Sequence, residues 1–340
     1  MLKIMSLLNK IFNRYISRFC VDFCIIMKTA YLLFALIAIS KCFIDNDNIL
    51  ITRESLEKLR RTVGYEIYNY DEHPFKNLKT SEIRNKLGLL GIPAGSPVKL
   101  PHGKSKEDLP KNFLSSEKWP RCIHPIRDQM RCGSCWAFAA SEVLSDRFCI
   151  SSIEEINVIL SPQDMVACDK FDYGCLGGYL DRSWNYLIDE GIVSEECYPY
   201  TAGSGGSCEC ILIDGQCINP QAEYKKYHAS AFYNFKSINE IKTDILYNGP
   251  VETGFLVYAD FLSYKSGIYK KASDQFMGGH AVKVVGWGFE DSSNTHYWIV
   301  ANSWGLIWGE EGFFKIEIGN CCDFESQMIS GTPKIVKNDY

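Results

Sequence analysis

Ten residues, Gln129 to Phe138, constrain this chain more than any other stretch. They read QMRCGSCWAF and place Cys135 directly after a Gly-Ser pair, at the start of an apolar run with nearly helical spacing. A helix N-terminus carries partial positive charge and unpaired N–H groups, so it favours the thiolate form of a cysteine. Because the thiolate is the form that attacks a carbonyl carbon, the stretch predicts a nucleophile at the head of a helix.

Gln129 lies shortly before this cysteine in the sequence. Its side-chain amide is a candidate donor, beside the backbone N–H of Cys135, to the oxyanion that forms during such an attack. The competing interpretation is that Cys135 is one more disulfide cysteine in a chain with 15 cysteines. The partners identified farther along the chain weigh against it.

Composition limits the compartment and the partners. Fifteen cysteines favour an oxidising compartment and a disulfide framework. A net charge of −5 gives no reason to expect nucleic acid or an anionic membrane as a partner. The length of 340 residues allows one globular enzyme together with processing segments.

Residues 1–42 are interpreted as an N-terminal extension and a secretory signal peptide whose core is 27–42. Met27 and Lys28 precede an apolar run from Ala30 to Ile39, which small residues follow. The run is shorter than the ~20 apolar residues of a transmembrane helix, so no stable membrane association is expected once the signal is removed. Translation from Met27, a longer leader that includes residues 1–26, and a signal anchor remain open alternatives.

Residues 43–108 contain no cysteine and form a separate segment. Thr52–Arg61 is predicted to be a helix, and Ser81–Leu87 a second one with Thr80 as its N-cap. Glycines and prolines from Gly91 onward then break regular structure. The segment is either an independent module or a propeptide that lies over a cleft, and its position before the main body favours an inhibitory propeptide.

Residues 109–340 are predicted to fold as an α+β domain with two lobes. The first half has helical patterns and the second half alternates as strands do. The predicted helices are Ser134–Cys149, Ser161–Val166 and Tyr179–Glu190, and the predicted strands are Ala281–Val285, Tyr297–Val300 and Phe313–Ile318. Ligand clefts often lie between such lobes, so the base for Cys135 is expected to come from the second half.

That half supplies His280, which follows two glycines and is predicted to open a strand, and then Asn302. The imidazole is expected to take the thiol proton and later to protonate the leaving amine. Asn302 is expected to orient the imidazole through its neutral acceptor oxygen, with Trp304 shielding that hydrogen bond. The other histidines are assigned to the surface or the core by default.

Five ordered sequence blocks resemble the papain-like cysteine proteases, and among them the cathepsin B group. The blocks are Asp128–Gln129 with Cys132–Phe138, Gly174–Tyr179, Gly278–Ala281, Ala301–Trp304, and the stretches Gly249–Glu252 and Val257–Tyr269. The resemblance covers about residues 109–334 well and 50–108 loosely. It implies a papain-like fold with a helical left lobe, an antiparallel β-barrel-like right lobe and the active-site cleft between them.

The same resemblance implies further properties of the chain. Gly177 and Gly178 are expected to bind the backbone of an extended peptide substrate, and Gln327 and Trp304 to line the substrate site. The implied protein is a monomeric zymogen inhibited by its own propeptide, acts on peptide or protein substrates, and uses no metal ion and no other cofactor. Its location is the secretory pathway, ending in the lysosome or vacuole or in the extracellular space.

The resemblance also implies disulfides Cys122–Cys149 and Cys132–Cys175, with Cys168 paired to the 197–217 group. With Cys135 set aside, the cysteines from Cys122 onward are odd in number, so at least one more is unpaired or pairs between chains. Cys321 or Cys322 is the expected one.

Departures from the cathepsin B pattern refine the predicted function. Tyr200–Tyr224 contains no histidine, so the loop that occludes one end of the cathepsin B cleft lacks its adjacent pair of histidines, and Leu176 stands where the family has asparagine. Gln327 replaces an acidic residue, unless Glu325 or Asp323 supplies that charge instead. The sequence thus predicts a cysteine-type endopeptidase; a non-catalytic secreted homologue, acting as a matrix or adhesion protein, is the alternative.

Overall fold

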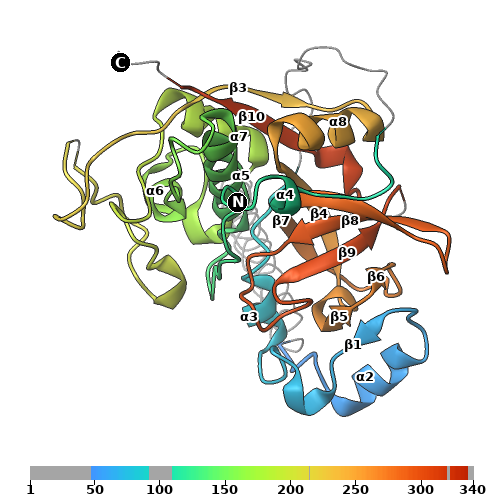
Figure 1. The fold of residues 1–340 in the computed structure, drawn as a ribbon. Helices are drawn as coiled ribbons and strands as arrows, with labels where there is room; N and C mark the ends of the chain where they lie inside the picture. Colours follow the sequence, from blue (N-terminus) through green and yellow to red (C-terminus); the bar gives the residue numbers. More distant parts are fainter. Residues whose placement is uncertain (1–46, 92–108, 214, 320–321, 336–340) are drawn as a thin grey trace, which may run out of the picture. The chain divides into compact units, whose positions relative to one another are not determined.

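The computed structural model describes residues 47–91, 109–213, 215–319 and 322–335 (Figure 1). Contacts divide the chain into residues 1–49, of which only 47–49 are described, and residues 50–340. The expected signal peptide and most of the stretch after Gly91 therefore lie outside the described residues. In the described part of the chain, none of the helices combines the length and apolar character that crossing a bilayer requires.

Residues 50–91 fold into short elements. These are α2 (Arg53–Arg60), β1 (Glu66–Ile67), a 3-10 turn at Tyr70–Glu72 and α3 (Thr80–Arg84). Thr52 caps α2 as expected, since its hydroxyl accepts from Ser55 N–H at 3.0 Å. The predicted N-cap of α3 is wrong by one residue: Lys79 is the cap, and the Glu82 carboxylate satisfies its N–H at 2.9 Å.

The helical half of the main body is built around α5. Its elements are β2 (Phe113–Leu114), α4 (Ser115–Lys118), α5 (Cys135–Ser151), α6 (Pro162–Cys168) and α7 (Leu180–Asp189), with 3-10 turns at Gly174–Leu176 and Ala202–Ser204. Cys135 is the first residue of α5, as the sequence predicts. Nearly every residue of α5 is buried, on all faces, so this helix is the centre of its half.

The second half is a mixed sheet. Its elements are β3 (Ala229–Asn234), α8 (Ile238–Asn248), β4 (Val251–Tyr258), β5 (Tyr264–Ser266), β6 (Ile268–Tyr269), β7 (Phe276–Glu290), β8 (Thr295–Ala301), β9 (Phe313–Glu317) and β10 (Ile329–Pro333), with 3-10 turns at Phe261–Ser263 and Glu325–Gln327. The strand order is β3-β10-β4-β7-β8-β9-β6, with β2 on β7 and a separate pair β1-β5. The described strands thus follow an open path and no closed barrel, and β6 pairs with β9 in parallel.

Strand β7 is longer than predicted and changes neighbours along its length. It pairs with β4 from Phe276 to Val284 and with β8 only from Lys283 onward. His280 therefore lies inside a strand, not at its start, which corrects the prediction. Before Lys283, one edge of β7 pairs with no other strand of the described residues, and an isolated bridge joins Gly279 there to Leu89.

Residues 50–91 share a hydrophobic core with this sheet. Leu56, Ile67 and Phe75 belong to the same buried cluster as Phe261 and Trp308. A second cluster surrounds α5 and α7 in the helical half. Because apolar burial is a main source of stability, the first segment is a packed part of residues 50–340.

Candidate active site

Cys135 lies where α5 packs against β7, the strand that carries His280. Cys135 is a free, fully buried thiol, and the backbone N–H groups of Ala281, Gly88 and Trp136 contact its sulfur. Ala281 directly follows His280, so the nucleophile candidate lies beside the strand that carries the base candidate. The fold thus places the two elements, which the sequence assigned to different lobes, next to each other.

The imidazole of His280 is oriented by Asn302. The Nε2–H of His280 donates to Asn302 Oδ1 at 2.7 Å, and the same oxygen accepts from Ser303 N–H at 2.8 Å. Nδ1 has no hydrogen-bond partner among the described residues, so its lone pair is available for a proton. The ring of Trp304 lies 4.7 Å from the His280 ring, centroid to centroid, and both residues are buried.

Burial keeps both groups neutral. It raises the pKa of the Cys135 thiol to about 11, although neighbouring N–H groups lower it, and it lowers the pKa of His280 to about 4 against the opposing effect of Asn302. In this state burial therefore opposes the thiolate that the helix N-terminus is expected to favour, and it favours the neutral form of both groups.

Residues 88–90 account for much of that burial, since they run between the two halves. Gly178 N–H donates to the carbonyl of Gly88 at 2.8 Å, and Leu90 N–H donates to the carbonyl of Gly178 at 3.0 Å. On the other side, Leu89 N–H donates to the carbonyl of Gly279 at 3.1 Å, on the edge of β7 that lacks a sheet partner. At Leu89 the segment runs parallel to the chain at Gly178, with which it forms an isolated β-bridge.

Three glycines make this close approach possible. A Cβ atom at Gly88 would lie 1.8 Å from the carbonyl oxygen of Gly133, beside Cys135 in the sequence. A Cβ at Gly177, whose φ is +120°, would lie 2.6 Å from the carbonyl oxygen of Gly88. One at Gly178 would collide with the ring of Trp136. Each of the three positions therefore requires glycine.

Gln129 is engaged by the same segment. Its Nε2 donates to the carbonyl of Lys86 at 2.9 Å and to that of Cys132 at 2.8 Å, and its Oε1 accepts from Ser303 at 2.7 Å. The Gln129 amide, which the sequence assigned to the oxyanion, thus lies beside the turn that precedes Cys135. In this structure it already donates to a carbonyl oxygen, that of Lys86.

Gln327 and Leu89 approach each other over Gly254. An ideal Cβ at Gly254 would lie 2.3 Å from Leu89 Cδ2 and 2.6 Å from Gln327 Oε1, so both side chains meet over this glycine. The Oε1 atom is buried and has no hydrogen-bond partner among the described residues. Glu325 is engaged elsewhere, because it accepts from Trp298 Nε1 at 2.9 Å and Gly319 N–H at 2.7 Å.

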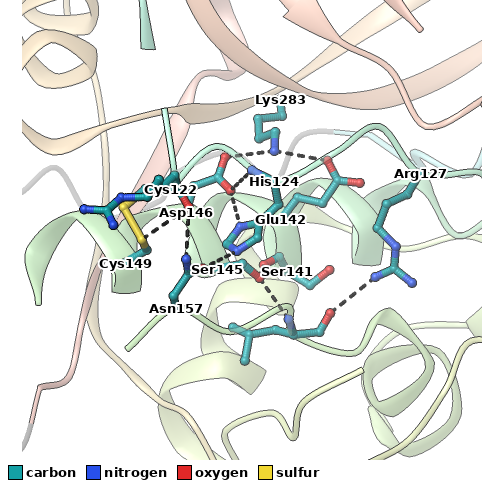
Figure 2. A network of polar contacts seen from close by, with 12 residues as sticks. Cys122, His124, Arg127, Ser141, Glu142, Ser145, Asp146, Cys149, Asn157 and Lys283 are labelled. Atoms are coloured by element: carbon teal, nitrogen blue, oxygen red, sulfur yellow. Dashed lines mark hydrogen bonds and ion pairs between the residues drawn. A yellow bond between two sulfur atoms is a disulfide. The ribbon is translucent and has the colours of Figure 1, made fainter. Parts of the chain in front are cut away.

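A buried polar network joins the helix of Cys135 to the strand of His280 (Figure 2). The Nζ of Lys283, on β7, lies 2.8 Å from Asp146 Oδ2 and 3.5 Å from Glu142 Oε2, both on α5. His124, which the sequence analysis left as surface or core, contacts Asp146 through Nδ1 at 2.6 Å and Asn157 through Nε2 at 2.9 Å. Ion pairs thus fix the relative position of α5 and β7.

Sequence reasoning missed two groups near the nucleophile. Gly88 gave no sequence signal of a place at the nucleophile. Glu252 is fully buried on β4, its Oε2 accepts from Trp184 Nε1 at 2.7 Å, and burial raises its pKa well above the usual range. It lies in the block Gly249–Glu252 that was noted for its resemblance, but nothing local revealed that this carboxyl is buried and acts on the pKa of Cys135.

The disulfides correct one expectation. Cys122–Cys149 and Cys132–Cys175 are paired, Cys168 pairs with Cys210, and Cys197 pairs with Cys217. Cys322 is disulfide-bonded, so the expectation of an unpaired cysteine is wrong there. The free cysteine besides Cys135, among the described residues, is the exposed Cys208. Its Sγ lies 3.3 Å from Cys175 Sγ, which Cys132 already occupies.

Comparisons with known proteins agree with this geometry. The chain is 38% identical over 264 residues to "Cathepsin B-like cysteine proteinase 4" of Caenorhabditis elegans, covering 69% of this chain and 78% of the relative. It is 41% identical over 251 residues to "Cathepsin B-like cysteine proteinase 3" of the same organism, covering 67% of each. The solved structure of "proCathepsin B S9 from Trypanosoma congolense" superposes with a TM-score of 0.76 at 31% identity, covering 85% of this chain and all of that one.

The match to a family as a whole covers the main body. Residues 109–332 match the family described as "Papain family cysteine protease". These residues include the helix that begins at Cys135, the strand of His280 and the Asn302 that orients the imidazole. The chain therefore belongs to the papain family of cysteine proteases and resembles its cathepsin B-like members.

Proposed function

We propose that this cysteine peptidase is a secreted zymogen of a cathepsin B-like endopeptidase, with residues 43–108 as its inhibitory propeptide and 109–340 as its catalytic domain. The observation that carries the proposal is the course of residues 86–90. They bond to Gly178, Gly279 and Gln129, which are the groups assigned to substrate and oxyanion. Four disulfides among the described residues support a route through an oxidising compartment, ending in the lysosome, vacuole or extracellular space.

The roles of the residues follow from their contacts. Once residues 86–90 leave, water enters the site, and the desolvation that keeps Cys135 and His280 neutral is reduced. His280 Nδ1 takes the thiol proton, and the thiolate attacks the substrate carbonyl to form a tetrahedral oxyanion. The backbone N–H of Cys135 and the freed Nε2 of Gln129 stabilise this oxyanion. His280 then protonates the amine as the C–N bond breaks, which leaves an acyl-enzyme thioester, while Asn302 keeps the ring oriented. Water, deprotonated by His280, hydrolyses the thioester and releases the acid product and the free thiol.

The same contacts account for resistance of the bound segment to cleavage. The N–H of Gly88 faces the thiol, while the carbonyl of Gly88 accepts from Gly178. The carbonyl on Gln129 belongs to Lys86, two residues away. No single carbonyl group of residues 86–90 therefore contacts both the nucleophile and the oxyanion donor, as attack requires.

Replacement of the nucleophile tests the mechanism. Cys135→Ala in the full-length chain is expected to abolish peptide hydrolysis and labelling by the epoxide E-64, while thermal unfolding remains cooperative. The wild-type chain, activated by acid, is expected to do both. Turnover by purified Cys135→Ala that survives removal of contaminating proteases would contradict the assignment.

The type of cleavage is a separate prediction. Thr201–Glu223 contains no basic residue, and holding a substrate C-terminal carboxylate in register needs a charged or hydrogen-bonding anchor. We expect cleavage at internal bonds and little release of C-terminal dipeptides. Mass spectrometry of the products from peptides with blocked N-termini, with either free or amidated C-termini, distinguishes the two. Faster cleavage of the free-acid peptides, two residues from their ends, would contradict an open cleft.

A further inference from the structure

Lys86 occupies a site of its own beside the oxyanion donor. Its side chain is only 8% exposed, and its ammonium donates to the carbonyl of Met130. Its own carbonyl accepts from Gln129. Three residues of the segment mark positions along the cleft: Leu89 pairs with Gly178, Gly88 faces the thiol, and Lys86 contacts Gln129. Leu89 also approaches Gln327. Lys86 therefore lies on the opposite side of the nucleophile from Gln327. That is the side of the cleft that receives the leaving group.

The carbonyl that binds Lys86 is held in an unusual conformation. Met130 has a φ of +54°, in the left-handed region that residues other than glycine seldom adopt. The Oδ1 of Asp128 accepts from Met130 N–H at 2.7 Å and stabilises this turn. Such a conformation is unfavourable and is retained where surrounding contacts determine it, often at functional sites. Here it orients an acceptor oxygen toward a buried ammonium.

Charges around the ammonium define what the site binds. Burial lowers the pKa of Lys86, the carboxylate of Asp128 raises it, and Arg131 lowers it further. The Phe75 ring, 5.8 Å from Nζ, belongs to the same segment as Lys86 and leaves with it. The carbonyl of Met130 and the carboxylate of Asp128 belong to the catalytic domain, so they remain in the cleft and both favour a cation.

We propose that Asp128 and the Met130 carbonyl form a subsite for a lysine or arginine side chain within the first two residues of the substrate's leaving group, a site that Lys86 fills in the zymogen. The inference rests on the proposed function and narrows its substrates to peptides with a basic residue just after the cleaved bond. The acceptor oxygens suit either side chain, since each offers several N–H donors.

The test uses enzyme activated by acid from the full-length chain and two sets of internally quenched peptides. Each set varies one position, the first or the second residue after the cleaved bond, among Lys, norleucine and Glu. Norleucine matches the length of lysine without its charge. At one of the two positions we expect kcat/KM for Lys to exceed that for norleucine at least fivefold, with Glu slowest. The Lys preference should shrink at high ionic strength, and mass spectrometry identifies the bond that is cut.

Variants connect the preference to the site. In Asp128→Asn the amide oxygen still accepts from Met130 N–H but the charge is gone, so the ratio of Lys to norleucine should fall toward one. The matched control Asp291→Asn changes an exposed carboxylate that pairs with Lys111 and should keep the wild-type ratio. Titration with E-64 counts competent enzyme in each preparation, so incomplete folding does not distort the rates.

The outcomes separate this inference from the proposed function. Cleavage of all peptides with no preference for Lys at either position overturns the subsite alone. A preference that Asp128→Asn retains in full overturns the role of Asp128. Absence of cleavage and of E-64 labelling in the wild-type enzyme overturns the proposed function, and the subsite with it.

Discussion

At the scale of single residues, we expect Gln327 to determine the chemistry of the pocket for the P2 side chain, where Leu89 approaches it over Gly254 in this structure. A neutral amide offers guanidinium an ordinary hydrogen bond, whereas a carboxylate offers a charge-assisted pair. We expect the enzyme to prefer apolar residues over arginine at the P2 position, one residue before the residue whose carbonyl is attacked. Gln327→Glu should improve cleavage of an Arg-Arg coumarin substrate relative to Phe-Arg about five- to thirty-fold, equivalent to ~1–2 kcal/mol.

The control is Gln221→Glu, which adds the same charge at an exposed position far along the chain from the pocket. It should leave the ratio of the two kcat/KM values unchanged. Equal cleavage of both substrates by the wild type, or no gain in Gln327→Glu, would show that another group sets P2 specificity. Glu325 is a poor candidate for that role, since both of its contacts, with Trp298 and Gly319, lie elsewhere.

At the scale of elements, the ion pairs of Lys283 fix the position of α5 relative to β7. Lys283→Met removes the ammonium from the buried carboxylates of Glu142 and Asp146 and leaves Asp146 with its contacts to His124. Breaking a buried pair in this way costs about 3–5 kcal/mol. For a domain of this size we expect the melting temperature to fall by about 10 °C, measured by circular dichroism at neutral pH in a Cys135→Ala background that prevents self-digestion. Lys315→Met is the control, because its partly exposed pair with Glu310 is worth about 1 kcal/mol or less. A similar loss in both variants would contradict a special role for the buried network.

The same elements show which features could be predicted from the sequence and which could not. The start of α5 at Cys135 was predictable because a local motif and a helical period coincide there. The placement of His280 at a strand end was wrong, since β7 extends through pairing with β4, and such pairing has no local signal. The network of His124, Asp146 and Lys283 likewise joins distant segments that only the tertiary structure brings together.

At the scale of the whole molecule, we expect His73 to make the binding of residues 50–91 to the catalytic domain depend on pH. Its Nε2–H donates to Ser263 Oγ at 3.1 Å, and its Nδ1 accepts from Phe75 N–H at 3.0 Å. The contact with Phe75 requires the neutral ring, because a protonated Nδ1 cannot accept a hydrogen bond, and burial lowers the pKa of His73 to about 4. Tyr68 and Phe75 pack around the ring, and Phe75 in turn contacts Trp304 over the active site.

The sign of the pH effect follows from the direction of this shift. A released segment has a histidine with a pKa near 6.5, so acid protonates the released form first. The contribution of His73 to the closed form is complete above about pH 6.5, declines as the pH falls toward 4, and does not change further below that. The stabilisation of the closed form that is lost between pH 6.5 and 4 is on the order of 3 kcal/mol.

We therefore expect acid to accelerate activation of the full-length chain between pH 6.5 and 4, and His73→Gln to flatten that dependence. Glutamine offers an acceptor for Phe75 N–H and a donor for Ser263 but does not titrate in this range. Activation is followed as the rate at which E-64 labelling of Cys135 appears at each pH. His296→Gln removes a histidine whose ring is tilted against that of Phe289 in the catalytic domain, and it should keep the wild-type dependence of the activation rate on pH. An equally steep slope in His73→Gln would mean that other groups release the segment.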